Sequence, residues 1–286
     1  TKIVLGQHYR GFNGKIDEFQ LWDTALDQNT IRQWMCRKIT NKHPFEAEHL
    51  MLYYRFDEGS GVELENTRGP GDMILSSGVT FVPSGAPLGD TSVYVYSAAK
   101  ENAIDLSIYH PDGDYLNITK AAGTSPENNA YGAHLYRVDG AAKFSTVPGS
   151  VLSLDSTRYW GVYIVPVGYT GPHRYQYVAR YYYQKNDNVA EEANIRLLDR
   201  INNSATAWNM NATGADLVNK RFSFTYTTPG STNPPYWHPY ISMPHEFMLG
   251  GITATAIDVD TARPPQPGAI TGPTNVCSGA FNIVYS

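Results

Sequence analysis

The chain is poor in cysteine, in charge and in long apolar runs, and each shortage argues against a class of protein. Its 286 residues include only two cysteines, with no CxxC pair or Cys/His cluster, which excludes a zinc site. Charged residues make up 17% of the chain and the net charge is −5, with Lys and Arg scattered, so no nucleic-acid-binding surface is expected. No run approaches the roughly 18 apolar residues of a membrane-spanning helix. Residues 1–10 lack the basic and apolar regions of a secretory signal peptide.

Recognised catalytic motifs are absent as well. The sequence contains no G-x-S-x-G, HExxH or P-loop pattern. Asp17 and Glu18 are adjacent acids in a stretch typical of a strand. They are therefore expected on opposite faces of it, solvated at its end, and not as the facing pair of a glycoside hydrolase. The eight histidines are isolated from one another, and His238 and His245 are expected at the surface of a proline-rich loop. We therefore expect a protein that is not an enzyme.

Aromatic and turn-forming residues are abundant instead. The chain has 21 Tyr, 25 Gly and 18 Pro, a balance typical of turn-rich β structure. The strongest pattern lies in residues 159–200. Apolar and polar residues alternate through Trp160–Val165 and through Tyr175–Tyr183, on either side of the turn formers Gly168–Pro172. This pattern predicts a β-hairpin with one buried face, which places Trp160 and Tyr181 in a core.

The same reading along the chain predicts an all-β fold organised as a tandem β-sandwich. A polar, Gly- and Pro-containing stretch at 84–90 separates a region of residues 1–85 from a central sandwich of residues 86–256. A proline-rich linker follows at 257–268 and a short last segment at 269–286. The central strands are expected at 92–96, 103–109, 115–118, 133–138, 159–165, 175–183, 193–198, 206–210, 221–227 and 246–249.

The first region is expected to hold short strands and one helix. The strands are predicted at residues 3–5, 15–22, 50–56, 73–75 and 79–82. Asp27 is a suitable N-cap for a short helix over residues 28–39, in which Ile31, Trp34 and Met35 follow helical spacing.

Two motifs in this region carry a resemblance. The stretch FNGKIDEFQLWDTALDQNTI resembles the closing segment of a laminin-G-like (concanavalin-A-like) jelly roll, and LYYRFDEGSG resembles its opening strand. The acidic loop that follows the opening strand in that family is degenerate here, as ENTRGPGDM. The resemblance implies that the strands of residues 15–22 and 50–56 pair side by side. It also implies an incomplete jelly-roll module in residues 1–85.

Two further stretches resemble parts of large secreted proteins. The central region, with LYRVDGAAK, YWGVYIV and HEFMLG, is similar to an uncharacterised β module of bacterial proteins that use type IX secretion. The end of the chain, PGAITGPTNVCSGAF, resembles the first strand of a PKD-like, immunoglobulin-type repeat. These resemblances imply a fragment of a large multidomain protein, extracellular or on the cell surface.

The implied role is structural and adhesive, as a stalk or a filament subunit for attachment or gliding. Its expected partners are neighbouring modules or copies of the same protein, joined by strand addition that a segment such as Phe281–Ser286 could supply. The alternative role is a carbohydrate-binding module that binds environmental or cell-surface glycans, with or without Ca²⁺.

Candidate site residues fall in two loops. Asp112 and Asp114 flank Gly113 and could hold Ca²⁺ with oxygens on one side of a tight turn, although Pro-Asp-Gly also favours a plain type I turn. The second candidate is a patch in the segment NPPYWHPY, which is either a partner-binding surface or a loop clamp. Its residues are Tyr236, Trp237, His238 and Tyr240.

Covalent modification is the last expectation. Cys36 and Cys277 could pair with each other or with cysteines of other modules, since sequence does not fix connectivity. Six residues match short glycosylation patterns, N-x-S/T or D-S/T-x, which are hints of an exported protein. They are Asn117, Asn202, Asn211, Thr24, Ser156 and Thr261.

Overall fold

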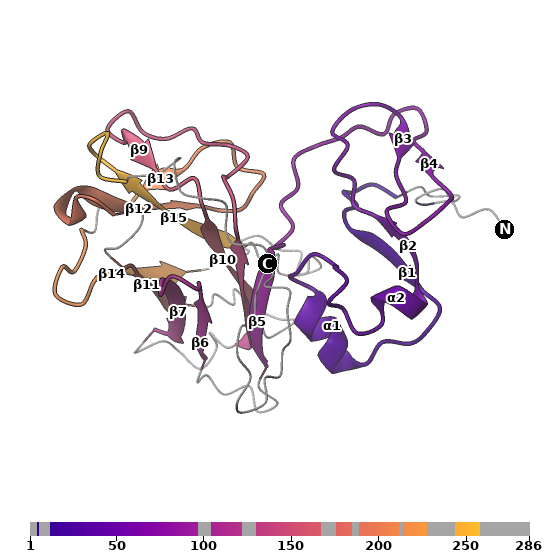
Figure 1. Ribbon diagram of the computed structural model, residues 1–286, viewed down its shortest axis with the longest axis horizontal. Coiled ribbons are helices and arrows are strands. Elements are labelled where there is room, and N and C mark those ends of the chain that lie inside the picture. Colours follow the sequence, from indigo (N-terminus) through magenta and orange to yellow (C-terminus); the bar gives the residue numbers. More distant parts are fainter. Residues whose placement is uncertain are drawn as a thin grey trace, which may run out of the picture.

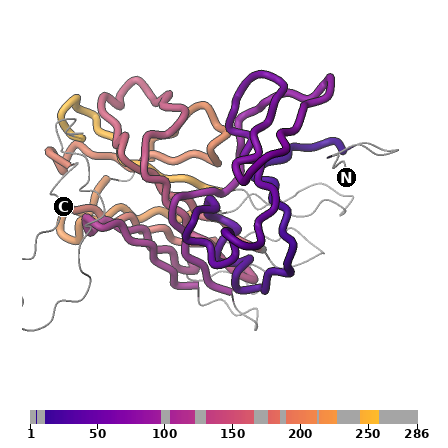
Figure 2. The backbone as a smooth tube through the Cα atoms, turned by 45° about the vertical axis from the view of Figure 1, so that its right-hand side comes forward, coloured from indigo at the N-terminus to yellow at the C-terminus, as the bar shows by residue number. Residues whose placement is uncertain are grey.

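The computed structural model describes Leu5 and residues 12–96, 104–121, 130–166, 176–184, 189–211, 214–227 and 244–257. Within these residues the chain is all-β, with fifteen strands, two short α-helices and one 3-10 helix. Figures 1 and 2 show an N-terminal lobe, drawn in indigo and purple, beside a larger β-sandwich. No helix in the described ranges has the length and apolar character needed to span a membrane.

The N-terminal lobe contains two small antiparallel sheets. β1 pairs with β2, with Phe19 opposite Tyr54 and Leu21 opposite Leu52, which confirms the expected pairing of these two stretches. β3 pairs with β4. The elements of this lobe are β1 (Phe19–Trp22), α1 (Gln28–Trp34), α2 (Glu46–His49), β2 (Leu50–Tyr54), β3 (Glu63–Leu64) and β4 (Met73–Ile74).

α1 begins where the sequence predicts and ends five residues earlier. The Asp27 side chain accepts a hydrogen bond from the Thr30 N–H at 2.9 Å, which confirms the N-cap. The prediction that the helix continues to residue 39 is wrong. Beyond Met35 the backbone turns to pair with another segment: the Gly89 N–H donates to Cys36 O, and the Lys38 N–H donates to Gly89 O. The long-range pairing replaces the helical bonds.

The sandwich consists of a seven-stranded and a four-stranded sheet. The large sheet has the order β13-β12-β15-β10-β8-β5, with β9 also paired to β15, and the small sheet has the order β14-β11-β7-β6. Their bounds are β5 (Thr91–Tyr96), β6 (Asp105–Tyr109), β7 (Tyr115–Lys120), β8 (Ala130–Val138), β9 (Ser153–Leu154), β10 (Tyr159–Pro166), β11 (Gln176–Tyr182), β12 (Ile195–Arg200), β13 (Asn209–Met210), β14 (Arg221–Thr227) and β15 (His245–Gly251).

The predicted hairpin of β10 and β11 is wrong. β10 pairs with β8 and β15 in the large sheet, whereas β11 pairs with β7 and β14 in the small one. The two strands face each other across the core, and the ring of Trp160 meets that of Tyr181 edge-on at 5.7 Å. Alternation correctly identified the buried face of each strand, but it contains no information on which strand is the hydrogen-bonded neighbour. Both rings are buried, as expected.

Three smaller expectations also fail. Residues 79–82 form no strand, and Val79 and Val82 are more than half exposed. The strand expected over 206–210 is shorter, since only Asn209–Met210 form β13. His245 is not a surface group: it opens β15, is 2% exposed, and stacks on the Tyr226 ring at 3.8 Å. Its side chain points from β15 toward the small sheet and packs on Phe224 and Tyr226 of β14, which accounts for this burial.

A row of polar side chains is buried on the outer face of the large sheet. Glu246 accepts hydrogen bonds from the Tyr136 hydroxyl and from Arg200 Nε, each at 2.7 Å. All three side chains are at most 1% exposed. Gly161 lies in the same row, opposite Tyr136 and Glu246, and a Cβ at this position would overlap the Tyr136 ring. The row therefore needs glycine at position 161. The neighbouring cluster around Trp208 covers its other end.

Replacing Arg200 is expected to destabilise the sandwich strongly. In Arg200→Met, Glu246 loses its counter-charge inside the protein, which costs about 3–5 kcal/mol of unfolding free energy. Urea unfolding measures it. The matched control is Arg196→Met on the same strand. Among the described residues its guanidinium donates to the carbonyls of Ala193 and Ile195, and its loss should cost under about 1 kcal/mol. Equal losses in the two variants would contradict the assigned role of the row.

Candidate functional site

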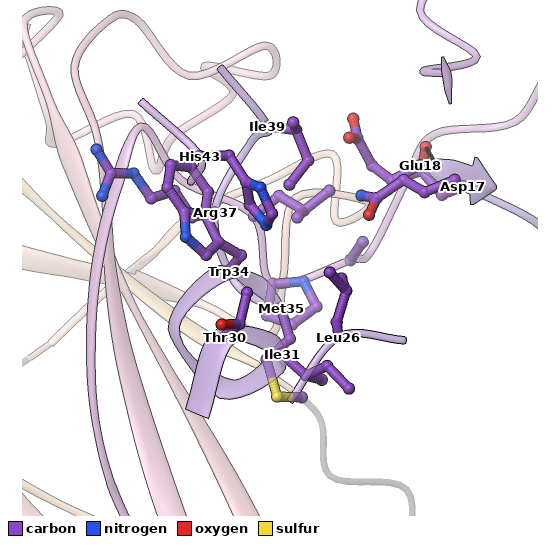
Figure 3. Close-up of a pocket in the computed structure, with 14 residues that line it drawn as sticks. Asp17, Glu18, Leu26, Thr30, Ile31, Trp34, Met35, Arg37, Ile39 and His43 are labelled. Carbon is purple, nitrogen blue, oxygen red and sulfur yellow. Dashed lines mark hydrogen bonds between the residues drawn. The ribbon is translucent and has the colours of Figure 1, made fainter. Parts of the chain in front are cut away.

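A cavity of about 330 Å³ lies in the N-terminal lobe, against the segment that leads to the sandwich (Figure 3). Cavities near this size and larger hold small ligands in many proteins. Three parts of the chain line it: residues before and in β1, one face of α1 with the segments on either side of it, and the connection at 86–88. The lining residues are Asp17, Glu18, Gln20, Leu26, Thr30, Ile31, Trp34, Met35, Arg37, Ile39, His43, Ala86, Pro87 and Leu88.

α1 forms one wall of the cavity, because residues spaced by one helical turn lie on the same face of the helix. Thr30, Ile31, Trp34 and Met35 are spaced three to four residues apart, so they share one face of α1. The other face of the same helix meets β5: the Arg32 guanidinium lies 3.9 Å from the centre of the Tyr96 ring, and the Ser92 hydroxyl donates to Gln33 O at 3.3 Å. α1 therefore connects the cavity to the sandwich.

Asp17 and Glu18 lie together at one side of the cavity. Sequence reasoning placed them on opposite faces of a strand end in solvent, and this is wrong, because β1 begins only at Phe19 and both residues are half-buried. Glu18 has a φ of 51°, a left-handed conformation uncommon for a non-glycine residue. Its N–H donates to Asp17 Oδ1 at 3.0 Å, which holds the backbone in this turn.

The partners of the two acids are mostly neutral. The Tyr53 hydroxyl donates to Glu18 Oε2, and the Ser84 hydroxyl donates to Asp17 Oδ2. The nearest cation is Arg55, whose Nε lies 3.9 Å from Glu18 Oε1. Burial raises the pKa of Asp17 and raises that of Glu18 to about 7, against the smaller opposing effects of these partners. Glu18 therefore titrates near neutral pH.

An aromatic wall stands opposite the acids. His43 is 4% exposed and packs between Trp22 and Trp34, with ring centres 4.6 and 4.8 Å away. Burial lowers the pKa of His43, so the ring is neutral at pH 7. Its Nδ1 accepts a hydrogen bond from the Phe45 N–H at 3.2 Å, which assigns the ring proton to Nε2. Sequence reasoning missed His43, because nothing in its own segment indicates that Trp22 and Trp34 enclose the ring.

The calcium candidates Asp112 and Asp114 lie at the turn between β6 and β7, where Gly113 has a φ of 103°. Asp112 contacts Arg158 and His110, and Asp114 accepts from the Gln184 N–H at 2.6 Å and the Tyr181 hydroxyl at 3.1 Å.

Their pKa values diverge. Burial opposes the charge on both; at Asp112 hydrogen bonds from His110 and the Asp114 N–H, with Arg158, outweigh burial and hold its pKa well below the usual range. Burial raises the pKa of Asp114 to about 6. Arg158 thus already supplies positive charge to the pair, and Ca²⁺ binding here stays a prediction. In the described ranges, this turn included, no group of three or more His, Cys, Asp or Glu is placed to hold a metal.

The remaining candidates separate into described and undescribed residues. Tyr236, Trp237, His238, Tyr240, Thr261 and Cys277 lie outside the described residues. Cys36 carries a fully buried thiol, and burial raises its pKa to about 12. Its pairing with Cys277 stays a prediction.

The described glycosylation candidates differ in their surroundings. Ser156 is exposed and Thr24 is half-buried. The Asn117 amide nitrogen donates to Asp105 Oδ1 at 2.7 Å and to Ser107 Oγ at 3.0 Å. Asn202 Oδ1 accepts from Ser204, and Asn211 is half-buried. Ser156 is thus the most accessible of them.

One feature of the outer face of the small sheet escaped sequence reasoning. Tyr109, Tyr115 and Tyr182 stack across β6, β7 and β11, with ring centres 4.9 and 4.2 Å apart, and Arg221 of β14 donates to the Tyr182 hydroxyl at 3.2 Å. We call these three rings the tyrosine stack. The signal was present, because Tyr182 alternates with the buried Tyr181 and Tyr183, but its neighbours follow only from strand register.

The comparisons with known proteins give no assignment. No protein-family model matches the chain, and no curated protein or solved structure matches it either.

The stability of the N-terminal lobe is expected to depend on the proton of Glu18. Its pKa is about 7 in the folded chain against an ordinary 4.5, so the native state keeps a proton that the unfolded chain has released between these values. The free energy of unfolding therefore falls as the pH rises through this window, by at most about 3 kcal/mol.

Glu18→Gln tests this effect. The variant should lack this part of the pH dependence, as measured by urea unfolding from pH 4.5 to 8. Glu63→Gln changes an exposed acid of the same lobe and should keep the wild-type profile. If Glu18→Gln and the wild type give parallel profiles, Glu18 titrates normally.

Proposed function

We propose that this chain is a non-enzymatic, extracellular structural and adhesive module, which assembles with neighbouring modules or with copies of itself through its N-terminal lobe. The observation that carries the proposal is that the lobe exposes many apolar side chains and has unpaired strand edges. The buried acids of the sandwich support a structural role, since Asp112, Asp114 and Glu246 have protein partners. The resemblance to secreted multidomain proteins supports the extracellular setting.

The apolar surface is concentrated in the smaller part of the protein. Of the fifteen large apolar or tyrosine side chains that are exposed in the described residues, nine lie between residues 12 and 82. Ile74 is 71% exposed, Val62 58% and Met51 55%. These side chains are available to the apolar surface of a partner. The nine are Phe12, Ile16, Ile31, Met35, Met51, Val62, Ile74, Val79 and Val82.

The sheets of the lobe also have unpaired edges. β1 pairs only with β2 among the described strands, and β3 only with β4. Two-stranded sheets are marginally stable by themselves, and an exposed edge is a template for another strand. A strand from a neighbouring module that pairs with β1 would supply backbone hydrogen bonds, as in other cases of strand addition. An adhesive stalk needs contacts of this kind between modules.

Polar substitution of this surface is expected to weaken assembly. Ile74→Asp and Met51→Asp place a charge where a partner would bury an apolar side chain, so self-association should fall about tenfold or more. Size-exclusion chromatography with light scattering, and electron microscopy for fibres, measure the state of assembly. The control is Val218→Asp, a 90% exposed position on the sandwich. Wild-type protein that stays monomeric at high concentration and binds no surface under flow contradicts the proposal.

A second candidate function is carbohydrate binding, and the tyrosine stack favours it. Tyr109 is 62% exposed on β6, which is the edge strand of the small sheet. Tyr115 covers one face of its ring. A sugar ring can stack on the other face, since aromatic rings offer a flat apolar surface. The turn with Asp112 and Asp114 follows Tyr109 directly in the sequence, at the end of β6.

Tyr109→Ala tests this second function. If the stack binds sugars, the affinity for any glycan found on an array should fall roughly tenfold, in line with the stacking of a single ring. Tyr131→Ala removes another exposed tyrosine, on β8, and should leave binding unchanged. Titrations with Ca²⁺ and with a chelator show whether Asp112 and Asp114 take part. Binding that is equal in the two variants places the sugar elsewhere.

A further inference from the structure

The cavity of the N-terminal lobe has an acidic side and a largely apolar middle part. Asp17 and Glu18 lie at one side, and Trp34 and Arg37 at the opposite side, as Figure 3 shows. Between them the lining is largely apolar. This apolar part consists of Leu26, Ile31, Met35, Ile39, Ala86, Pro87 and Leu88. The shape suits a ligand with an apolar stem and one polar end.

The charge of the acid pair is poorly balanced by the protein. Arg55 is the nearest cation, at 3.9 Å from Glu18, and its Nη2 already bonds Asp57 at 2.7 Å. The Arg37 guanidinium does not help, because it lies over the ring of Trp34 at 4.5 Å, on the far side of the indole. The hydroxyls of Tyr53 and Ser84 are neutral. A carboxylate buried with neutral partners attracts a cation.

The Glu18 side chain is held firmly at this position. It is 12% exposed, and the left-handed backbone of Glu18 is fixed by the bond from its N–H to Asp17. Backbone strain of this sort is concentrated at functional sites. The acids are thus oriented in advance of any ligand.

We propose that this cavity binds a primary ammonium group carried on a short unbranched alkyl chain. Asp17 and Glu18 accept hydrogen bonds from the ammonium, and Leu26, Ile31 and Met35 cover the stem. An ammonium has three hydrogen-bond donors, and the oxygens of the two carboxylates can accept from them. The same chemistry belongs to free alkylamines and to the lysine side chain of another protein. Ile31 and Met35 also belong to the exposed apolar surface of the lobe, whereas Asp17 and Glu18 do not.

The primary test is a titration of the whole chain with n-butylammonium, followed by two-dimensional amide NMR. The neutral match is n-butanol, which has the same stem. At pH 8 we expect n-butylammonium to bind at least about tenfold more tightly, because a hydrogen bond to a charged group is worth about that factor or more. Equal affinities for the two compounds would overturn the proposal.

Substitutions locate the site. Glu18→Gln and Asp17→Asn keep the shape of the side chains and should each weaken n-butylammonium binding about tenfold. The control Glu63→Gln should bind as the wild type does. Ile31→Trp fills the cavity from α1 without touching the acids and should abolish binding. Unchanged affinity in Glu18→Gln and Ile31→Trp, or an equal loss in Glu63→Gln, contradicts the assignment. If Glu18→Gln fails to fold, Asp17→Asn and Ile31→Trp still decide.

The pH dependence adds an independent reading. Binding requires charged Glu18, so the affinity should fall as the pH drops below 7, and this fall should be absent from Glu18→Gln. A pH profile shared by both proteins would contradict the role of Glu18. The other titratable or charged groups around the carboxyl and the cavity are Asp17, Tyr53, Arg55, Asp57, Arg37 and His43.

A second ligand, Nα-acetyl-lysine methylamide, distinguishes a free amine from the lysine side chain of a partner protein. Tighter binding of this compound than of n-butylammonium indicates a lysine side chain of a partner protein. Tighter binding of n-butylammonium indicates a free amine. Either result supports the site, and failure of both ligands to bind overturns it.

Discussion

The packing of the two sheets against each other is the constraint on which the structure depends. Trp160 and Tyr181 meet at its centre, one from each sheet. The large sheet is also covered on its outer face, where Tyr159, Leu198 and Met248 form a second apolar cluster. Strands between two covered faces have no solvent side, which is why every residue of β15 is buried. A polar row can persist there only because each of its groups has a partner.

The attachment of the N-terminal lobe follows from one close approach. A Cβ at Gly89 would lie 2.5 Å from the carbonyl oxygen of Arg137, so glycine is needed where the connection crosses β8. The backbone here is hydrogen-bonded to both parts of the protein. Gly89 bonds Cys36 and Lys38 of the N-terminal lobe, and the Asp90 N–H donates to Arg137 O of the sandwich at 2.8 Å. Residues 86–88, which precede this crossing, line the cavity together with α1. The connection that attaches the lobe thus also lines the cavity.

Sequence patterns predicted the elements better than their partners. Most sandwich strands were located to within a few residues, because alternation reflects which face is buried. The assignment of β10 and β11 to one hairpin failed, since pairing is decided by contacts between distant residues. The cavity was beyond prediction for a similar reason. Nothing local signals the left-handed turn at Glu18, and the burial of His43 depends on Trp22 and Trp34 closing around it.

The buried thiol of Cys36 makes the contact between the lobes observable. Its side chain has no exposed surface, and it lies at the junction, bonded through its backbone to Gly89 and close to Tyr96, Tyr136 and Tyr163 of the sandwich. With a pKa of about 12, it is almost entirely protonated and unreactive in the closed molecule. An alkylating reagent can therefore modify it only when the N-terminal lobe separates from the sandwich or the structure around Cys36 opens locally. The rate of Cys36 alkylation therefore measures how often these openings occur. A pulling force on the chain that favours opening would increase this rate.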